Sequence, residues 1–169
     1  MDAPHGRQPG ARGSPDALVL DGRSAEDGSP MRLTIHDGLI AAIERPDGVA
    51  ADAWISPGWL DIQVNGFDGH DPNASDADGP ATAAMARSLW RWGVTGSCVT
   101  ICTESEEHML RSIRAVAVAG ESDPLIEASV VGVHVEGPHI AREDGPRGAH
   151  PVEHVRPPDV GEYRRWQEA

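Results

Sequence analysis

The sequence predicts an α/β fold, the N-terminal part of a (β/α)8 barrel preceded by a small β-sandwich-like domain. Short apolar runs separated by turn signals come first, and strands that alternate with helices follow them. The chain has 169 residues, whereas a closed barrel typically requires roughly 250. We therefore expect the barrel to be incomplete in this chain.

Changes in composition along the chain predict the domain boundaries. Residues 1–15 are rich in Pro, Gly and Arg and poor in apolar side chains, which is typical of a disordered tail. Residues 16–54 carry the short apolar runs of a small β-domain, and Asp37-Gly38 between two of them is a strong hairpin signal. Residues 55–169 are expected to form the first three βα units of the barrel.

Strand and helix patterns alternate through the barrel segment. Stretches rich in β-branched and other apolar residues predict strands at 54–66, 93–101 and 128–136. Apolar residues at helical spacing, together with start signals, predict helices at 80–92, 105–119 and 159–167. This alternation indicates parallel strands joined by right-handed crossovers.

The charge and cysteine content narrow the function classes. The net charge of -13 disfavours binding to nucleic acid or to an anionic membrane surface. All basic residues are Arg, so neither Schiff-base chemistry nor a carbamylated Lys is available.

Cys98 and Cys102 would lie about 13 Å apart on one strand, too far for a disulfide. With neither a signal peptide nor a membrane span visible, we place the protein in the cytoplasm.

The strand that ends at Glu136 carries the first candidate functional side chain. His134 and Glu136 share one strand face, with Glu136 at the carboxyl end, where parallel α/β folds place their active sites. A solvated glutamate at an ordinary strand end is the simpler interpretation. Metal binding gains support because an unpaired glutamate is costly to bury in an apolar strand. His134 is interpreted as a residue that orients the strand.

A second polar pair, Gln63 and Asn65, stands at the end of the first predicted barrel strand. Their spacing of two places both amides on one face. Neutral amides are weaker zinc ligands than imidazoles, so one metal site is favoured over two. A plain hairpin turn at Asn65-Gly66 is the competing interpretation, and it is weakened because no complementary strand follows directly.

Four landmarks, taken in order, resemble the N-acetylglucosamine-6-phosphate deacetylases of the amidohydrolase superfamily. They are the segments PGWLDIQVNG at 57–66, GVTG at 93–96, GVHVEGP at 132–138 and GAH at 148–150. The resemblance covers about residues 17–166 and places this chain in the N-terminal portion of the family. It implies the barrel type of the metal-dependent hydrolases.

The resemblance implies a role for each matching residue. Glu136 corresponds to the glutamate ligand of the catalytic metal, which is usually one zinc ion. Gln63 and Asn65 match the variant of the first-strand motif associated with a single metal. Ala149 and His150 resemble the substrate-binding residues, with His150 facing the sugar phosphate.

The implied reaction is the metal-dependent hydrolysis of N-acetylglucosamine 6-phosphate to glucosamine 6-phosphate and acetate, a step of amino-sugar catabolism. In the family, a catalytic aspartate and two further metal-binding histidines come from later strands. We therefore expect no catalytic acid or base within these 169 residues, and no activity of the chain alone. The implied partners are a small amino-sugar phosphate, a homodimer mate or a complementing C-terminal half, with no nucleic acid and no membrane.

Two alternatives remain open at this stage. The chain would act as a non-catalytic remnant or split-enzyme subunit if a separate C-terminal half completes the barrel. It would instead be another amidohydrolase, acting on a cyclic amide, if the substrate pocket differs. A His-x-His motif in place of Gln63 and Asn65 would have favoured the cyclic-amide enzyme.

Overall fold

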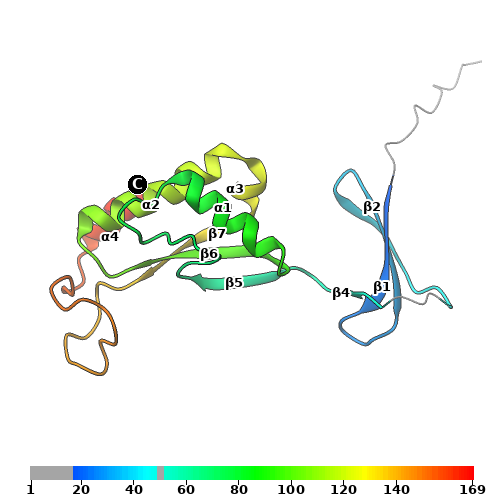
Figure 1. Cartoon of the computed structure of the whole chain (residues 1–169), viewed down its shortest axis with the longest axis horizontal. Helices are drawn as coiled ribbons and strands as arrows, with labels where there is room; N and C mark the ends of the chain where they lie inside the picture. Colours follow the sequence, from blue (N-terminus) through cyan, green and yellow to red (C-terminus); the bar gives the residue numbers. More distant parts are fainter. Residues whose placement is uncertain (1–16, 49–51) are drawn as a thin grey trace, which may run out of the picture. The chain divides into compact units, whose positions relative to one another are not determined.

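A computed structural model describes residues 17–48 and 52–169 of the chain. The expected tail at residues 1–15 lies outside the described residues. The chain divides into two compact units, Met1–Pro57 and Gly58–Ala169, each of which is described by itself below (Figure 1).

The first unit contains one four-stranded sheet with the order β3-β2-β1-β4. Its strands are β1 (Leu18–Ser24), β2 (Pro30–His36), β3 (Leu39–Glu44) and the short β4 (Trp54–Ile55), which pairs in parallel with β1. Asp37 and Gly38 form the predicted hairpin turn between β2 and β3, and both have the positive φ that such a turn requires. Within the described residues, this unit contains a single sheet.

The second unit is an α/β layer built on a parallel three-stranded sheet with the order β5-β6-β7. The strands are β5 (Trp59–Val64), β6 (Val94–Cys102) and β7 (Val130–Glu136). The helices are α1 (Gly79–Trp90), α2 (Glu106–Ser122), α3 (Pro124–Ser129) and α4 (Val160–Gln167). Figure 1 shows α1 and α2 lying along the same face of this sheet.

The helices begin where the sequence provides a capping side chain. Asp78 accepts a hydrogen bond from the backbone N–H of Ala81 at 2.8 Å at the start of α1, and Ser105 caps α2 through His108. Asp123 and Asp159 cap α3 and α4 in the same way. Each cap satisfies a backbone donor that has no partner within the helix, which fixes where the helix starts.

The core of this unit lies between the sheet and the helices. Val64, Val99 and Ile101 are buried against apolar side chains of α1, α2 and α4, and the largest of these are Met85, Leu89, Met109, Ile113 and Trp166. Alternation along the strands sends their other side chains to the opposite face, which leaves polar residues free to build a site.

The sequence prediction was wrong at the start of two strands. The strand expected at 54–66 is divided: Trp54–Ile55 form β4 in the sheet of the first unit, and β5 begins only at Trp59. Residues 128 and 129 were expected to begin the third strand, but they belong to α3. Pro124 and the cap at Asp123 start a short extra helix directly after α2. The β-branched strand pattern begins only at Val130, where the chain turns from helical to extended backbone.

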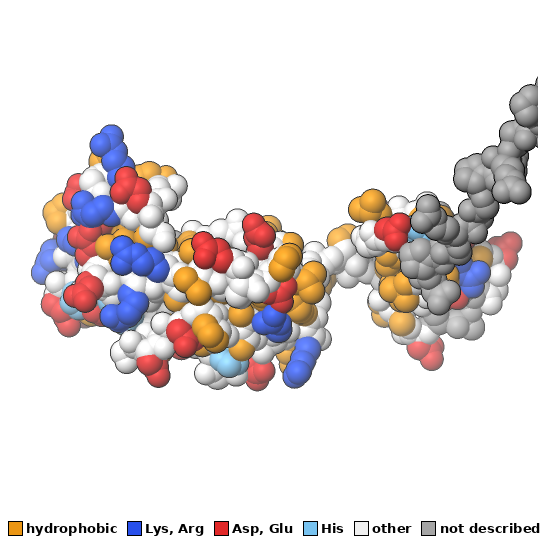
Figure 2. All heavy atoms as spheres, turned by 90° about the horizontal axis from the view of Figure 1, so that it is seen from above, with side chains coloured by type: hydrophobic (Ala, Val, Ile, Leu, Met, Phe, Trp, Pro, Cys, Tyr) orange, Lys and Arg blue, Asp and Glu red, His pale blue; other side chains and the backbone are white. Residues whose placement is uncertain are grey.

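Charges of both signs are interspersed on the α/β unit. On the face shown in Figure 2, its acidic and Arg side chains alternate instead of forming a patch of one sign. Several of them pair, among them Arg87 with Asp123 and Arg165 with Glu106. None of the helices in the described part of the chain is both long and apolar enough to cross a membrane.

Candidate functional site

The candidate site lies at the carboxyl ends of the three parallel strands. The register of β6 and β7 places Cys102 directly beside Glu136, and β5 ends next to β6 with Val64 paired to Val99. Strand ends that meet at one edge bring side chains from distant parts of the sequence together. This is the edge where parallel α/β folds assemble their sites.

The carboxylate of Glu136 is held between the two amides that the sequence analysis singled out. Gln63 Nε2 donates to Glu136 Oε1 at 3.1 Å, and Asn65 Nδ2 donates to Glu136 Oε2 at 2.9 Å. Each carboxylate oxygen therefore receives one amide hydrogen from β5 or the residue that follows it. The side chain of Glu136 is 31% exposed and remains accessible to a ligand.

The backbone around Glu136 is fixed by close packing against β6. Thr103 Oγ1 donates to the carbonyl oxygen of Glu136 at 3.1 Å. Gly137 follows with φ +87, and a Cβ atom there would lie 1.9 Å from Thr103 Oγ1. Only glycine suits this position, because it tolerates positive φ and leaves room for the threonine.

The loop after β7 brings the third group of expected residues to the same place. Ala149 and His150 line a cleft of about 610 Å³ together with Glu136 and Asn65. His150 Nε2 lies 3.8 Å from Glu136 Oε1. The structure thus brings Gln63, Asn65, Glu136 and His150 close together.

Arg147 fixes the part of this loop that carries His150. Its guanidinium donates to the carbonyl oxygen of His150 at 2.6 Å and to that of Arg142 at 3.3 Å. A planar guanidinium with several donors can hold two carbonyl groups in a defined arrangement. The position of the imidazole in the cleft is therefore set by the loop itself.

His134 takes part in strand packing. Its Nδ1 lies 3.0 Å from the carbonyl oxygen of Ile62 in β5. The ring thus connects β7 to the strand that carries Gln63, which agrees with the interpretation of His134 as an orienting residue.

Cys102 is a member of the site, although the sequence analysis considered it only as a disulfide partner and excluded that role. Its Sγ lies 3.7 Å from Glu136 Oε2 and 3.3 Å from Asn65 Nδ2. Burial raises the pKa of the Cys102 thiol and the Glu136 charge adds to this, while the hydrogen bond from Asn65 opposes it. The only signal in the sequence was that Cys102 ends a strand three residues before a helix cap.

Asn73 is a second residue that the sequence analysis missed. Its side chain accepts from the backbone N–H of Cys102 at 2.7 Å and donates to the carbonyl oxygen of Thr100 at 2.9 Å. It therefore attaches the loop after β5 to the end of β6. A single Asn in a loop rich in Asp gives no sequence signal for this role.

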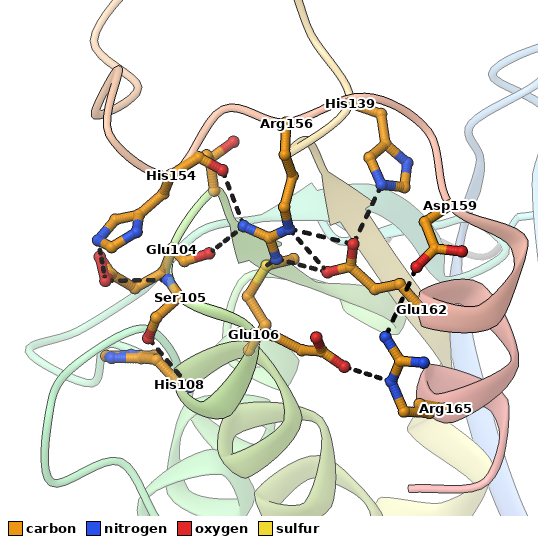
Figure 3. A network of polar contacts seen from close by, with 12 residues as sticks. Glu104, Ser105, Glu106, His108, His139, His154, Arg156, Asp159, Glu162 and Arg165 are labelled. Carbon is orange, nitrogen blue, oxygen red and sulfur yellow. Dashed lines mark hydrogen bonds and ion pairs between the residues drawn. The ribbon is translucent and has the colours of Figure 1, made fainter.

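A buried polar network anchors the far end of the loop after β7 (Figure 3). Arg156 donates to the carboxylate of Glu162 and to the carbonyl oxygens of Glu104 and His154 at 2.9 and 2.8 Å. Glu162 is 2% exposed and also contacts His139 Nε2 at 3.2 Å. The network joins the loop to α4 and to the segment that precedes α2.

The electrostatics of Glu162 follow from this arrangement. Burial raises the pKa of the carboxyl group, but hydrogen bonds from Arg156 and His139 outweigh burial, so the pKa lies below its ordinary value. Glu162 is therefore an ionised partner of Arg156 near neutral pH. Local sequence patterns do not indicate this pair, because a change from loop to helix separates the two residues.

The donor set fits one side of a metal site. Glu136 supplies an anionic oxygen and Cys102 a sulfur, whereas Gln63 and Asn65 supply only neutral amides. Catalytic zinc typically has three protein ligands and a water molecule. Across residues 17–48 and 52–169, no group of three or more His, Cys, Asp or Glu side chains could hold a metal ion. Further ligands would have to come from other sequence.

Comparison with known proteins relates the chain to one kind of enzyme. No family model matches it. The N-acetylglucosamine-6-phosphate deacetylase of Rattus norvegicus is 39% identical over 142 residues, which cover 83% of this chain and 32% of the relative. The chain thus spans about a third of the length of such relatives.

Solved structures agree with this relationship. The N-acetylglucosamine-6-phosphate deacetylase of Thermotoga maritima superposes with a TM-score of 0.74 at 24% identity, over 88% of this chain and 39% of that one, which supports the fold. A variant of the Mycobacterium smegmatis enzyme, solved in complex with N-acetyl-D-glucosamine-6-phosphate, gives a TM-score of 0.69 at 26% identity. That match covers 91% of this chain and 41% of the enzyme.

Proposed function

Since the chain belongs to the N-acetylglucosamine-6-phosphate deacetylase family, of which it represents an N-terminal portion, we propose that it serves in the deacetylation of N-acetylglucosamine 6-phosphate. The products are glucosamine 6-phosphate and acetate. The observation that carries the proposal is the Glu136 carboxylate, held by Gln63 and Asn65 on the same cleft as Ala149 and His150.

In this proposal Glu136 is the protein ligand of a single divalent metal ion, zinc. Such an ion, when bound, polarises the amide carbonyl and lowers the pKa of a bound water molecule. Gln63 and Asn65 orient the carboxylate through their amide hydrogens and leave its remaining lone pairs free. They are positioning residues, because neutral amides bind zinc more weakly than the carboxylate does.

Ala149 and His150 would bind the substrate. The imidazole of His150 lies at the cleft, and Arg147 fixes the backbone of His150. The imidazole can therefore bind an anionic phosphate group without a prior ordering of the loop. A preorganised donor contributes more to affinity than one that must be immobilised on binding. The backbone of Ala149, next to the positive-φ residue Gly148, faces the same cleft.

We further propose that β5, β6 and β7 are the first three strands of a (β/α)8 barrel. In the described residues β7 pairs only with β6, and Val131 on β7 is 56% exposed. An unpaired strand edge with exposed apolar residues favours pairing with a further strand. That strand, together with the missing metal ligands and the acid/base aspartate, would come from sequence beyond the segment described here, in the same polypeptide or in a separate subunit.

We expect the 169-residue chain alone to be inactive, because its site offers fewer than the three protein ligands of a catalytic zinc. We place the reaction in the cytoplasm, where a thiol such as Cys102 stays reduced. The partner molecules in this proposal are the amino-sugar phosphate and the remaining part of the barrel, with a homodimer as a further expectation.

The proposal is tested by joining residues 17–166 to the C-terminal part of a family member and measuring acetate release from N-acetylglucosamine 6-phosphate. The chimera should be active, and Glu136→Gln should abolish activity. Glu153→Gln is the matched control, because Glu153 is an exposed residue of the same loop region. Equal activity after Glu136→Gln would show the role of Glu136 to be wrong, and ring opening of a cyclic amide without acetate release would show the substrate class to be wrong.

A further inference from the structure

The end of β6 extends beyond the last residue of β5. The last register pair of the two strands is Val64 with Val99, whereas β6 continues to Cys102. The backbone groups on this edge of the final β6 residues therefore need partners other than β5. The half-buried side chain of Asn73, in the loop after β5, provides them.

The two hydrogen bonds of Asn73 with β6 reproduce the pattern of a parallel strand. In a parallel ladder, a residue donates its N–H to the carbonyl group before its partner residue and accepts from the N–H group after it. Asn73 Nδ2 donates to the carbonyl oxygen of the fully buried Thr100 at 2.9 Å, and Asn73 Oδ1 accepts from the backbone N–H of Cys102 at 2.7 Å. The carboxamide thus takes the place of a β5 residue opposite Ile101.

Asn73 is itself held by its neighbours. Asp71 Oδ1 accepts from the backbone N–H of Asn73 at 2.8 Å. His108 Nε2, in the first turn of α2, donates to the carbonyl oxygen of Asn73 at 2.9 Å. With the two bonds to β6, the backbone and side-chain donors and acceptors of Asn73 all have partners. A side chain fixed in this way can hold other residues in a defined position.

Two of the contacts of Asn73 lead directly to the candidate metal ligand. The carbonyl oxygen of Asn65 lies 3.5 Å from Asn73 Nδ2, and the side chain of Asn65 donates to Glu136 Oε2 at 2.9 Å. Cys102, whose backbone N–H bonds to Asn73, is the register partner of Glu136. Asn73 therefore connects the end of β5 to the end of β6 beside the carboxylate of Glu136.

We propose that Asn73 is a positioning residue of the proposed metal site and that it acts on Glu136 through Asn65. The inference rests on the proposed function, because it requires a metal ion at Glu136. Loss of the Asn73 carboxamide would release Asn65 from β6, and Glu136 Oε2 would then lose the amide that orients it. Partners that orient a metal ligand from outside the coordination sphere contribute strongly to metal affinity.

The contact with β6 is tested in the 169-residue chain itself. Amide hydrogen exchange, followed by NMR, should be slow at Cys102 in the wild type and much faster in Asn73→Ala, which removes the acceptor of this N–H group. Ser75→Ala, at an exposed position of the same loop, is the matched control and should leave the exchange unchanged. Equally slow exchange at Cys102 in Asn73→Ala would overturn the inference.

The effect on the metal is tested in the protein that joins residues 17–166 to the C-terminal part of a family member. Asn73→Ala should weaken zinc binding about 10- to 100-fold, measured by competition with a chromogenic chelator. Ser75→Ala should match the unsubstituted protein. Asn73→Ser replaces the carboxamide by a hydroxyl group that is too short to bond β6 in both places. It should weaken binding in the same direction, and it serves if Asn73→Ala does not fold.

A double-variant cycle separates positioning through Asn65 from a general loss of stability. If Asn73 acts through Asn65, then adding Asn73→Ala to Asn65→Leu should weaken zinc binding no further. A purely structural role would lower the free energy of unfolding and leave the zinc affinity of the folded protein unchanged, which would overturn the inference. Effects that multiply in the double variant would also overturn it.

The unsubstituted joined protein separates failure of this inference from failure of the proposed function. If that protein binds zinc through Glu136 and Asn73→Ala binds it equally well, the role of Asn73 is wrong and the proposed role of Glu136 stands. If the unsubstituted protein binds no zinc, both are overturned.

Discussion

Asn65 Nδ2 and Glu136 Oε2 lie 2.9 Å apart although 71 residues separate them in the sequence. This hydrogen bond crosses from the end of β5 to the end of β7, over the intervening β6. It shows that the polar residues at three strand ends belong to one site whose centre is the carboxylate of Glu136.

Replacing Asn65 by Leu should weaken zinc binding about 10- to 100-fold, the usual effect of losing a partner that orients a metal ligand. The substitution keeps the side-chain size and removes the amide hydrogens that hold Oε2. Competition with a chromogenic chelator measures the affinity. Gln167→Leu, at an exposed position of α4, is the control. An unchanged affinity for Asn65→Leu would show that Oε2 needs no orientation.

Gly137→Ala should disrupt the site more than the same change at Gly145. Both glycines have positive φ, at +87 and +90, so both variants carry about 1–2 kcal/mol of backbone strain. Only at Gly137 does the added Cβ atom meet another atom, Thr103 Oγ1 at 1.9 Å, whereas nothing lies within 4 Å at Gly145. Urea unfolding followed by circular dichroism should therefore show a larger loss for Gly137→Ala, and equal losses would contradict the packing described around Glu136.

Much of this organisation could be predicted from the sequence. The hairpin at Asp37-Gly38, the alternation of strands and helices, and the shared face of Gln63 and Asn65 follow from local rules of turn chemistry and side-chain periodicity. The meeting of Gln63, Asn65 and Glu136 followed from the rule that parallel strands end at one edge.

The remaining features depend on contacts that local rules do not describe. The place of Cys102 in the site depends on the register between β6 and β7, and a single strand pattern does not determine register. The helix α3 was missed because its six residues are too few to show helical periodicity. The pairing of Arg156 with Glu162 depends on how the loop folds over α4.

Breaking the pair between Arg156 and Glu162 should destabilise the α/β unit by about 3 kcal/mol, because it leaves a buried carboxylate without its cation. Glu162 is 2% exposed, and Arg156 also holds two backbone carbonyl groups of neighbouring segments. Urea unfolding of Arg156→Met measures the loss. The double variant Arg156→Met with Glu162→Leu should recover much of it, and a loss of similar size in both would mean that the buried charge is not the cause.

The same pair predicts a pH dependence of stability. The pKa of Glu162 is lower in the folded chain than its ordinary value of 4.5, so its ionised form favours folding. This contribution is fully present above pH 4.5 and disappears as the pH falls through the lowered pKa. Unfolding free energies measured between pH 7 and pH 3 should decline in the acid range. The decline should be smaller in Glu162→Gln but unchanged in Glu153→Gln, and parallel curves for all three proteins would exclude Glu162 as the titrating group.

The role of Glu136 as a metal ligand is the central claim, and zinc content tests it most directly. Residues 17–166 joined to the C-terminal part of a family member should retain about one zinc ion per chain after dialysis, measured by elemental analysis. Glu136→Gln should retain almost none, while Glu153→Gln should match the unsubstituted protein. Full zinc retention by Glu136→Gln would contradict the account.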